Sequence, residues 1–341
     1  MHALPRDDVY QALELAGDFW AMHQGARILV TGATGTIGRW LLETIHAANE
    51  AMNCRIEVVA LVRDEQRAFR RLGLARRSDL SLIQGDVRTF DGSIGGFDLC
   101  VHAAAQIGNG PDALDVFDTT VSGTRRMLDL AHRAGAGRFL LTSSGAVYGE
   151  QPRSVLKLAE TYVGAPALSV KAAYANAKRA AEWITLASTS DSKSGLTACI
   201  ARIFAVAGPG LPLDGHFAFG NFIGDVVERR AIAVNGDGRT LRSYLYLSDV
   251  ASWLLRILRD GRGGEAYNVG SEREVSVGAL ARMVAQAGQG KAVEVHQSPS
   301  ETGPSERYVP DTSKARAELG VRETVPLEAA VTKTVNWALA R

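Results

Sequence analysis

The sequence has few cysteines and no pattern that would use them. Cys54, Cys100 and Cys199 stand far apart among 341 residues. They fit neither the framework of a disulfide-rich protein nor the close spacing of a metal site. We therefore expect reduced thiols, as in a cytoplasmic protein, and no bound metal.

The chain also lacks an excess of charge and a long apolar run. Lys and Arg number 38 against 37 Asp and Glu, which offers no basic surface for nucleic acid or an anionic membrane. No apolar run approaches the roughly 20 residues that span a bilayer. The first residues, MHALPRDDVYQALELAGDFW, are acidic where a secretion signal is basic and then apolar. These absences predict a cytoplasmic protein that binds neither nucleic acid nor membrane.

Short apolar segments alternate with segments of helical periodicity through the first two thirds of the chain. In IGRWLLETIHAAN, VSGTRRMLDLAHRAG and AYANAKRAAEWITLA, apolar residues recur every three or four positions. The apolar segments are mostly continuous, as is typical of parallel strands covered on both faces. They lie at 27–31, 56–62, 80–84, 97–103, 138–144 and 196–204. This order predicts an α/β fold with a doubly wound parallel (Rossmann) sheet.

The character of the chain changes after Gly208, where GPGLPLDGHFAFGNF is rich in glycine and proline. We predict a Rossmann domain at 26–205, to which 240–262 returns with a helix at about 249–259. The remaining segments, 206–239 and 263–341, form a smaller C-terminal α/β lobe that binds substrate.

Residues 1–25 are expected to form an N-terminal helical extension. Its helix, over 7–22, places four apolar residues on one face, which we expect to pack against the flank of the domain. These residues are Val9, Leu13, Ala16 and Trp20.

A glycine-rich turn, TGATGTIG, joins the first strand to the first helix. Gly32, Gly35 and Gly38 would allow a tight turn, close approach to a pyrophosphate and close helix–strand packing. The helix N-terminus, at Thr36 and Ile37, would present free N–H groups to the phosphates. The spacing is GxxGxxG rather than GxGxxG, and alone it could be a mere turn. Its place between strand and helix favours a dinucleotide site.

TGATGTIG also resembles the cofactor loop of the extended short-chain dehydrogenase/reductases, the family of nucleotide-sugar epimerases and dehydratases. The resemblance extends over nearly the whole chain, from about Arg27 to Trp337. It implies an NAD(P)-dependent enzyme that acts on a nucleotide-diphosphate sugar, with a homodimer formed through the helix of Tyr174.

The resemblance implies further cofactor contacts. Asp86 and Val87, after the third strand, resemble the family's adenine-contacting turn. Ala103 and Ala104, after the fourth, resemble its segment beneath the cofactor. We interpret His102, in the same segment, as a core histidine with satisfied hydrogen bonds.

The tip of the second strand, ALVRD, bears on the choice of cofactor. An acidic residue there would bind the adenosine ribose hydroxyls and select NAD, but by the family's spacing Val62 stands there and Arg63 follows. A guanidinium could bind the 2′-phosphate of NADP. The alternative is a surface arginine without a ligand. NADP(H) is therefore favoured over NAD.

KAAYANAKRAAEW carries Tyr174 and Lys178 four residues apart, on one face of a helix. The ammonium should lower the pKa of the phenol and make it a usable general base. SSGAVYG resembles the family's serine segment and places Ser144 at the catalytic position, where its hydroxyl would bind the substrate oxygen that Tyr174 deprotonates. We expect Thr142 and Ser143 to be satisfied within the backbone turn.

The residues after Ser144 limit which of the family's reactions we expect. Sugar 4,6-dehydratases of the family carry an Asp-Glu pair directly after the catalytic hydroxyl residue. GDP-mannose dehydratases and UDP-glucuronate decarboxylases carry a glutamate in this segment. Here those positions are Gly145 and Ala146. The resemblance then implies hydride chemistry at sugar C4, as in an epimerase with Tyr174 as acid/base.

Two alternatives remain open. One is an NADPH-dependent 4-ketoreductase of a nucleotide-linked 4-keto-deoxysugar, which Arg63 favours. The other is a non-catalytic dinucleotide sensor on the same fold, which would have no need for Tyr174 and Lys178.

The second lobe supplies the expected substrate contacts. Arg242 and Arg307 stand in segments that resemble those meeting the nucleotide diphosphate, although either could be an ordinary surface arginine. His216 and Asn221, in the Gly/Pro segment, are expected to line the sugar pocket.

Two positions depart from the family. Thr120 and Ala205 stand where it often has asparagine. The first could alter a hydrogen bond that supports the active site, and the second removes an amide that often touches substrate.

Overall fold

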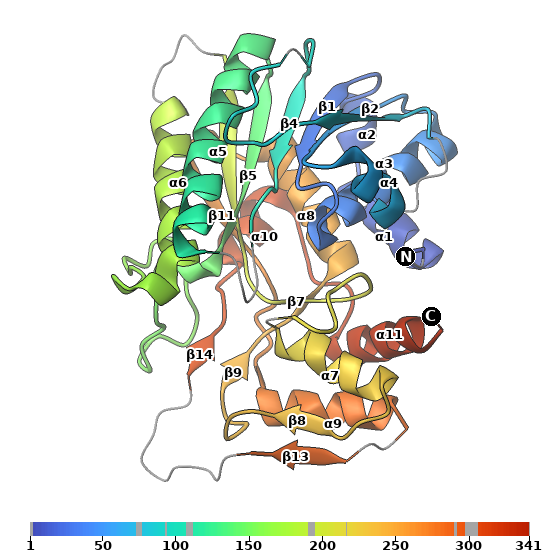
Figure 1. Ribbon diagram of the computed structural model, residues 1–341, viewed down its shortest axis with the longest axis vertical. Coiled ribbons are helices and arrows are strands. Elements are labelled where there is room, and N and C mark those ends of the chain that lie inside the picture. Colours follow the sequence, from blue (N-terminus) through green and yellow to red (C-terminus); the bar gives the residue numbers. More distant parts are fainter. Residues whose placement is uncertain are drawn as a thin grey trace.

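The computed structural model (Figure 1) describes residues 3–72, 77–92, 94–106, 112–189, 195–215, 217–289, 292–296 and 306–340. His216, which the sequence places in the sugar pocket, lies outside these ranges.

A seven-stranded sheet forms the upper part of the molecule in Figure 1, and all its pairings are parallel. Its order is β11-β6-β5-β4-β1-β2-β3, so the chain starts at the centre and winds outward in both directions. This confirms the doubly wound fold predicted from the alternating segments. The strands are β1 Arg27–Thr31, β2 Glu57–Val62, β3 Leu80–Gln84, β4 Leu99–His102, β5 Arg138–Ser144, β6 Thr197–Ile203 and β11 Ala266–Val269.

Helices cover both faces of this sheet. In Figure 1, α5 (Ala113–Ala134) and α6 (Ala173–Thr189) lie side by side on one face, while α3 (Thr36–Met52) and α8 (Leu247–Asp260) cover the other. Successive residues of β1 belong to different cores: Ile28 and Val30 pack in one cluster and Leu29 in another. This two-sided burial explains why the strand segments are continuously apolar.

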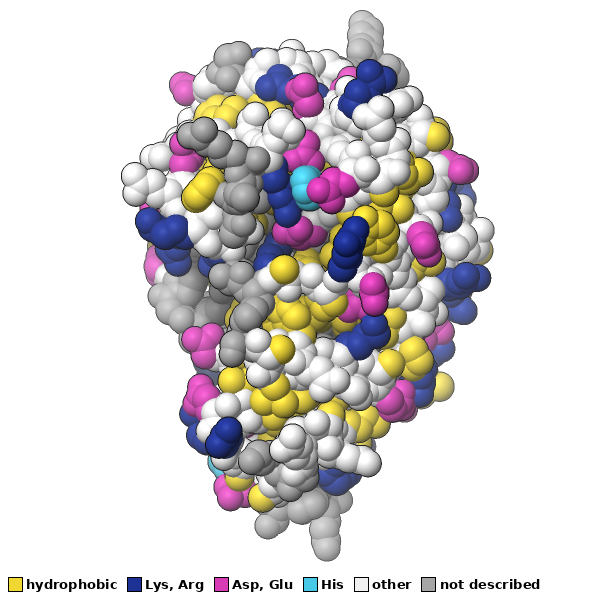
Figure 2. Space-filling view, turned by 90° about the vertical axis from the view of Figure 1, so that its right-hand side faces the viewer, with side chains coloured by type: hydrophobic (Ala, Val, Ile, Leu, Met, Phe, Trp, Pro, Cys, Tyr) yellow, Lys and Arg dark blue, Asp and Glu magenta, His cyan; other side chains and the backbone are white. Residues whose placement is uncertain are grey.

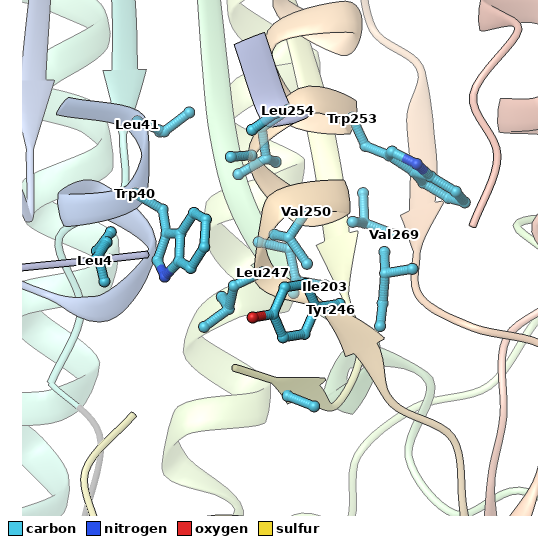
Figure 3. Close-up of a cluster of buried hydrophobic side chains, with 14 of the residues drawn as sticks. Leu4, Trp40, Leu41, Ile203, Tyr246, Leu247, Val250, Trp253, Leu254 and Val269 are labelled. Carbon is cyan, nitrogen blue, oxygen red and sulfur yellow. The ribbon is translucent and has the colours of Figure 1, made fainter. Parts of the chain in front are cut away.

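The larger core lies where α3 meets the start of α8. Figure 3 shows Trp40 of α3 close to Tyr246 and Leu247, with Val250 and Leu254 further along α8. The Trp40 and Tyr246 rings meet edge to face, with centroids 6.2 Å apart. These large side chains are almost fully buried and hold α3, with the turn before it, against the sheet.

The N-terminal extension differs from the single helix predicted over 7–22, and that prediction is wrong. The chain forms α1 (Arg6–Ala16) and a short α2 (Phe19–Met22), because Gly17 adopts a φ of 60° and breaks the first helix. The predicted apolar face is confirmed, since its four residues are all buried. They are Val9, Leu13, Ala16 and Trp20.

The lower part of the molecule holds short elements of the later chain. The predicted helices at 277–287 and from 327 are confirmed, and the one expected at 249–259 begins two residues earlier, as α8.

The remaining elements of the whole molecule are short strands and further helices. The short strands are β7 Val206–Ala207, β8 Ile232–Val234, β9 Leu241–Arg242, β10 Leu245–Tyr246, β12 Val275–Ser276, β13 Val293–Val295 and β14 Arg307–Tyr308. The other helices are α4 Glu65–Leu72, α7 Ala218–Val227, α9 Val277–Ala287, α10 Ser313–Leu319 and α11 Leu327–Leu339, with 3-10 turns η1 Gly145–Tyr148 and η2 Val170–Ala172.

The division into domains stays a proposal, and one strand crosses it. β11 falls within the 263–341 segment that the sequence assigns to the substrate lobe, yet it pairs with β6 at the edge of the large sheet. Within the segment 240–262, α8 packs on α3, β5 and β6.

No helix in the described part of the chain is long and apolar enough to cross a membrane. Among the same residues, no group of three or more His, Cys, Asp and Glu side chains could hold a metal ion. Figure 2 shows one face of the molecule, on which Lys and Arg side chains are scattered among Asp and Glu.

Candidate active site

The glycine turn at the end of β1, which we call the cradle, packs closely against its neighbours. Gly32 has a φ of 70°, and a Cβ there would lie 2.4 Å from the carbonyl oxygen of Ala103. A Cβ on Gly38 would lie 2.3 Å from the Gly32 carbonyl oxygen, so this close approach of helix and turn requires glycine. Gly35 caps α3, whose first residues are Thr36 and Ile37. The cradle and the free N–H groups behind it fit the phosphates of a dinucleotide.

The Gly/Pro segment is tied directly to the start of α3. The Thr36 hydroxyl donates to the Gly210 carbonyl oxygen at 3.1 Å, and the Trp40 indole donates to that of Pro209 at 2.9 Å. The start of α3 and the Gly/Pro segment are therefore held together.

Where the sequence predicts the adenosine contacts, the carboxylates already have protein partners. Asp64 accepts a hydrogen bond from the Arg67 backbone N–H at 2.8 Å and so caps α4. Asp86 is held by the Arg88 side chain and backbone, and these hydrogen bonds keep the pKa of its carboxyl below the ordinary value. Arg63 is exposed at the end of β2, on the side where its charge reaches Asp86.

The segment after β4 lies beneath the glycine turn. The Ala104 N–H donates to the Thr31 hydroxyl at 3.2 Å, and His102 Nδ1 lies 2.7 Å from the same oxygen. Burial lowers the pKa of His102 to about 3, so its ring is neutral. The interpretation of His102 as a satisfied core histidine is confirmed. Ala103 and Ala104 are partly exposed, and Val87 is buried nearby against the position of Gly123.

The structure brings Ser144, Tyr174 and Lys178 together. Ser144 ends β5, and its hydroxyl accepts from the Ala146 N–H at 3.2 Å. Its influence on Tyr174 of α6 acts to lower the pKa of that phenol. Lys178 lies one turn further along α6, with Nζ 5.9 Å from the centre of the Tyr174 ring. Its ammonium donates to the Thr142 carbonyl oxygen at 2.7 Å, which anchors it beneath the end of β5.

The pKa values differ from the sequence-based expectation. Burial raises the pKa of Tyr174 to about 12, and the influence of Ser144 only partly opposes this. Burial also lowers the pKa of Lys178 to about 8, against the opposing charge of Glu182. The expectation that Lys178 lowers the pKa of Tyr174 is wrong for the protein by itself, because desolvation of the phenolate dominates.

The expectation that Thr142 and Ser143 serve the backbone turn is also wrong. Thr142 donates to the carbonyl oxygen of His102 at 3.2 Å, and Ser143 donates to the Glu182 carboxylate at 2.5 Å. Glu182 is only 7% exposed and also accepts three hydrogen bonds from Arg202. The sequence does carry a signal for Glu182, since it follows Lys178 at the same four-residue spacing that separates Lys178 from Tyr174.

A second phenol, Tyr308 of β14, also lies near Ser144 and was missed from the sequence. Burial raises the pKa of its phenol above the ordinary value, and the influence of Ser144 acts in the opposite direction. The Tyr308 oxygen lies where a side chain on Gly145 would begin, 2.5 Å from an added Cβ, and the Phe204 ring lies 2.6 Å from it. Tyr308 and Phe204 therefore fill the space directly beside the serine.

The two arginines expected to bind the substrate, Arg242 and Arg307, have different surroundings. Arg242 pairs with Tyr308 in the β9–β14 ladder, and its guanidinium carbon lies 5.8 Å from the centre of that ring. Successive side chains of a strand point to opposite faces, so Arg307 points away from Ser144, and it pairs with Glu274 at 3.0 Å.

Asn221, on α7, carries a buried amide oxygen, Oδ1, with no hydrogen-bond partner among the described residues. A native protein rarely leaves such an atom unsatisfied, so it marks a place for a ligand or water.

The two residues that depart from the family pattern, Thr120 and Ala205, both take part in hydrogen bonds within the protein. Thr120 is buried and donates to the carbonyl oxygen of Val116, one turn earlier in α5, at 2.9 Å. The Ala205 carbonyl oxygen accepts from the Leu245 N–H at 3.1 Å.

The cradle, the phenol–lysine pair and the sheet order agree with a comparison to known families. The model of the NAD-dependent epimerase/dehydratase family matches residues 28–270, and the chain belongs to this family. The resemblance drawn from TGATGTIG is thus confirmed.

Individual relatives catalyse different reactions. The chain is 33% identical over 219 residues to UDP-glucuronic acid decarboxylase 1 of Arabidopsis thaliana, a match that covers 64% of this chain and 49% of the relative. It thus spans about half the length of that decarboxylase. It is 29% identical over 323 residues to the dTDP-glucose 4,6-dehydratase of Streptomyces niveus, covering 91% and 92% of the two chains.

Among solved structures, MoeE5 in complex with UDP-glucuronic acid and NAD is similar over most of its length. The TM-score is 0.75 with 26% identity, and the match covers 91% of this chain and 98% of MoeE5. The homologues are therefore nucleotide-sugar enzymes or proteins that bind NAD and a nucleotide sugar.

Proposed function

We propose that this chain is an NAD(P)-dependent nucleotide-sugar epimerase that acts at sugar C4. One observation carries the choice among the family's reactions. Ser144, Tyr174 and Lys178 lie together and can move a proton to and from a substrate hydroxyl. The two residues that follow Ser144, Gly145 and Ala146, have no group that transfers protons. Removal of water needs a positioned acid or base beside the hydroxyl residue. That space holds an aromatic pair instead.

Each residue has a role that its environment supports. A nicotinamide dinucleotide bound at the glycine turn supplies the hydride acceptor and a positive charge that favours the ionised phenol. Tyr174 takes the proton of the C4 hydroxyl and later returns it. Ser144 binds the same substrate oxygen. Lys178, with a pKa of about 8, carries much of its positive charge at neutral pH and holds the end of β5 through Thr142.

The substrate contacts come from the second lobe. Arg242 lies on the face of β9 that meets Tyr308 and would bind the diphosphate. The unsatisfied amide oxygen of Asn221 would accept a hydrogen bond from the sugar. His216 and Arg307 remain expectations from the sequence, and the ion pair of Arg307 with Glu274 would have to open for it to meet a phosphate.

A 4-ketoreductase is the second candidate, and Arg63 favours it. Arg63 is exposed at the tip of β2, while Asp64 caps α4. The Arg63 guanidinium can therefore bind a 2′-phosphate. Denaturing fresh protein and identifying the released nucleotide by mass spectrometry tests the cofactor. Stoichiometric NAD supports the epimerase and overturns the proposed role of Arg63. NADP(H), or an empty site that takes NADPH over NADH, supports the reductase.

The substitution Tyr174→Phe separates an enzyme from a dinucleotide sensor. We expect turnover of UDP-glucose or UDP-glucuronic acid to fall at least about 100-fold, since a positioned acid/base contributes roughly 10²–10⁴. NAD binding, measured by calorimetry, should be retained because the glycine turn is untouched. A parent protein that binds NAD and turns over no sugar nucleotide would favour the sensor.

We also propose a second copy of the chain as the partner. The α5–α6 surface exposes large apolar side chains, among them Leu114 and Trp183, which are 78% and 69% exposed. Large apolar side chains exposed on a helical surface are a feature of protein–protein contact sites. Sedimentation should give twice the 36.4 kDa mass of the chain, and a monomer at micromolar concentration would contradict this.

The proposed location is the cytoplasm. Cys54, Cys100 and Cys199 are free and buried, which suits a reducing compartment. Cell fractionation would test the location directly.

A further inference from the structure

A buried carboxylate, that of Glu182, lies behind the proposed catalytic residues and has no task in the proposed reaction. Tyr174, Lys178 and Glu182 follow one another on α6 at intervals of four residues, so their side chains share one face of the helix. Glu182 is 7% exposed. A carboxylate at this depth is costly unless it is paired and hydrogen-bonded, so its partners show what it holds.

Two neighbouring strands supply the partners of Glu182. Ser143 of β5 and Arg202 of β6 stand opposite each other in the parallel ladder, and both side chains reach the carboxylate. The Ser143 hydroxyl donates to Oε1 at 2.5 Å. Arg202 donates from Nε to Oε1 at 3.0 Å and from Nη2 to Oε2 at 2.7 Å, which makes a bidentate ion pair. Glu182 therefore ties α6 to the ends of both strands.

The guanidinium of Arg202 is held in turn. Its Nη1 donates to the Tyr148 hydroxyl at 2.9 Å, and that hydroxyl donates to Oδ1 of Asn268 on β11 at 2.8 Å. Tyr148 ends the η1 turn, which begins directly after Ser144. The network thus contacts the chain on both sides of the catalytic serine, at Ser143 and at Tyr148.

The same helix makes a second contact with the end of β5. Lys178 Nζ donates to the carbonyl oxygen of Thr142 at 2.7 Å, so α6 also holds the residue before Ser143. Ser144 is the next residue of the strand. Its position against α6 is therefore set by two consecutive contacts, one with Lys178 and one with Glu182.

We propose that Glu182 is a positioning residue: through Ser143 it fixes the end of β5 against α6, and so holds the Ser144 hydroxyl where it meets the same substrate oxygen as Tyr174. This inference rests on the proposed roles of Ser144 and Tyr174. Arg202 belongs to the same device, because without its guanidinium the buried carboxylate would be left without its ion pair.

The substitution Ser143→Ala tests the proposal with little disturbance, because it removes the donor and leaves the ion pair of Glu182 with Arg202 in place. With UDP-glucose or UDP-glucuronic acid as substrate, and with enzyme counted by bound NAD, we expect kcat to fall about 10-fold, the worth of one hydrogen bond. KM should change by less than about twofold, because Arg242 of the second lobe is proposed to bind the diphosphate.

Two further variants separate positioning from loss of folded protein. Thr185→Val is the matched control: it removes a buried hydroxyl of α6 that donates to the Ala181 carbonyl oxygen at 2.9 Å, and it should leave kcat unchanged. In a protein that already carries Ser144→Ala, adding Ser143→Ala should lower kcat no further, because the contact acts through the Ser144 hydroxyl. Damage to the fold would lower kcat in both backgrounds.

Hydrogen exchange of the NAD-bound protein tests the same contact without turnover. The Ala146 N–H donates to Ser144 Oγ at 3.2 Å, so its exchange reports on the position of that hydroxyl. We expect Ser143→Ala to speed exchange in the segment 142–149 about 10-fold, as measured by mass spectrometry. Thr185→Val should leave this segment unchanged.

Unchanged kcat or unchanged exchange in Ser143→Ala would overturn the inference, and so would a further loss of kcat in the Ser144→Ala background. If Ser144→Ala alone leaves kcat unchanged, the proposed role of Ser144 fails first and the inference fails with it. A parent protein without turnover would contradict the proposed function, and the exchange measurement would then decide whether Glu182 and Ser143 position the end of β5.

Discussion

Lys178 sets the balance of charge at the centre of the site. It is 2% exposed, and its ammonium has the carbonyl oxygen of Thr142 as hydrogen-bond acceptor and the carboxylate of Glu182 one turn away. Ser143 and Arg202 hold that carboxylate in turn. The charged lysine is thus supported by a network behind β5.

The pH dependence of folding stability should show the buried lysine. Its pKa is 10.5 ordinarily and about 8 in the folded protein. Between these values the unfolded chain binds more protons, so the free energy of unfolding should rise with pH across this window. Lys178→Met should lack this rise, as measured by chemical denaturation at several pH values. Parallel curves for the two proteins would contradict the burial of a charged lysine.

For single residues, the sequence predicted which residues form the site better than it predicted the contacts they make. Ser144, Tyr174 and Lys178 could be found because their spacing is local and periodic. Tyr308 and the acceptor of Ser143 could not, because each contact joins segments distant in sequence. A hydroxyl that donates to a carboxylate on a neighbouring helix leaves no pattern within its own segment.

Among the elements, the turn between β1 and α3 depends most strictly on its residues. Gly32 and Gly25 both have positive φ, 70° and 73°, but only Gly32 faces a close neighbour, since nothing lies within 4 Å of a Cβ on Gly25. The two positions therefore separate backbone strain from loss of the cradle.

Gly32→Ala should abolish detectable NAD binding, because the new methyl group collides with the backbone at Ala103. Gly25→Ala, the matched control, should lower the free energy of unfolding by about 1 kcal/mol through backbone strain alone and keep NAD binding. Calorimetry and chemical denaturation measure both effects. Equal NAD affinity in the two variants would show that the cradle is not the cofactor site.

The sequence predicted the long elements well and the short ones poorly. β1 and β5 have the predicted bounds, because continuous apolar runs mark strands covered on both faces. The break at Gly17 was missed since α1 and α2 share one apolar face. β11 could not be assigned to the large sheet, because four residues do not say which neighbour they pair with.

The whole molecule is held together by a buried contact between its two ends and its middle. Asp8 of α1 is 2% exposed and accepts from the Tyr246 hydroxyl at 2.6 Å and from Lys333 Nζ of α11 at 2.5 Å. The N-terminal extension thereby links the start of α8 to the last helix.

Asp8→Asn should lower the free energy of unfolding by about 1–3 kcal/mol, since it removes one charge of a hydrogen-bonded cluster. Turnover should be unchanged, because the site lies elsewhere. Asp7→Asn, at an exposed position beside it, is the control and should change stability by less than about 0.5 kcal/mol. Equal stability of the two variants would mean that the extension is held by its apolar face alone.

The most direct test of the central claim is proton NMR of UDP-glucose and UDP-glucuronic acid incubated with the purified protein and no added cofactor. We predict that the C4 epimer of at least one substrate appears, with C5 and C6 intact, and that Tyr174→Phe stops its formation. Release of carbon dioxide, formation of a 4-keto-6-deoxy sugar, or reaction only with a 4-keto sugar and added NADPH would contradict the epimerase.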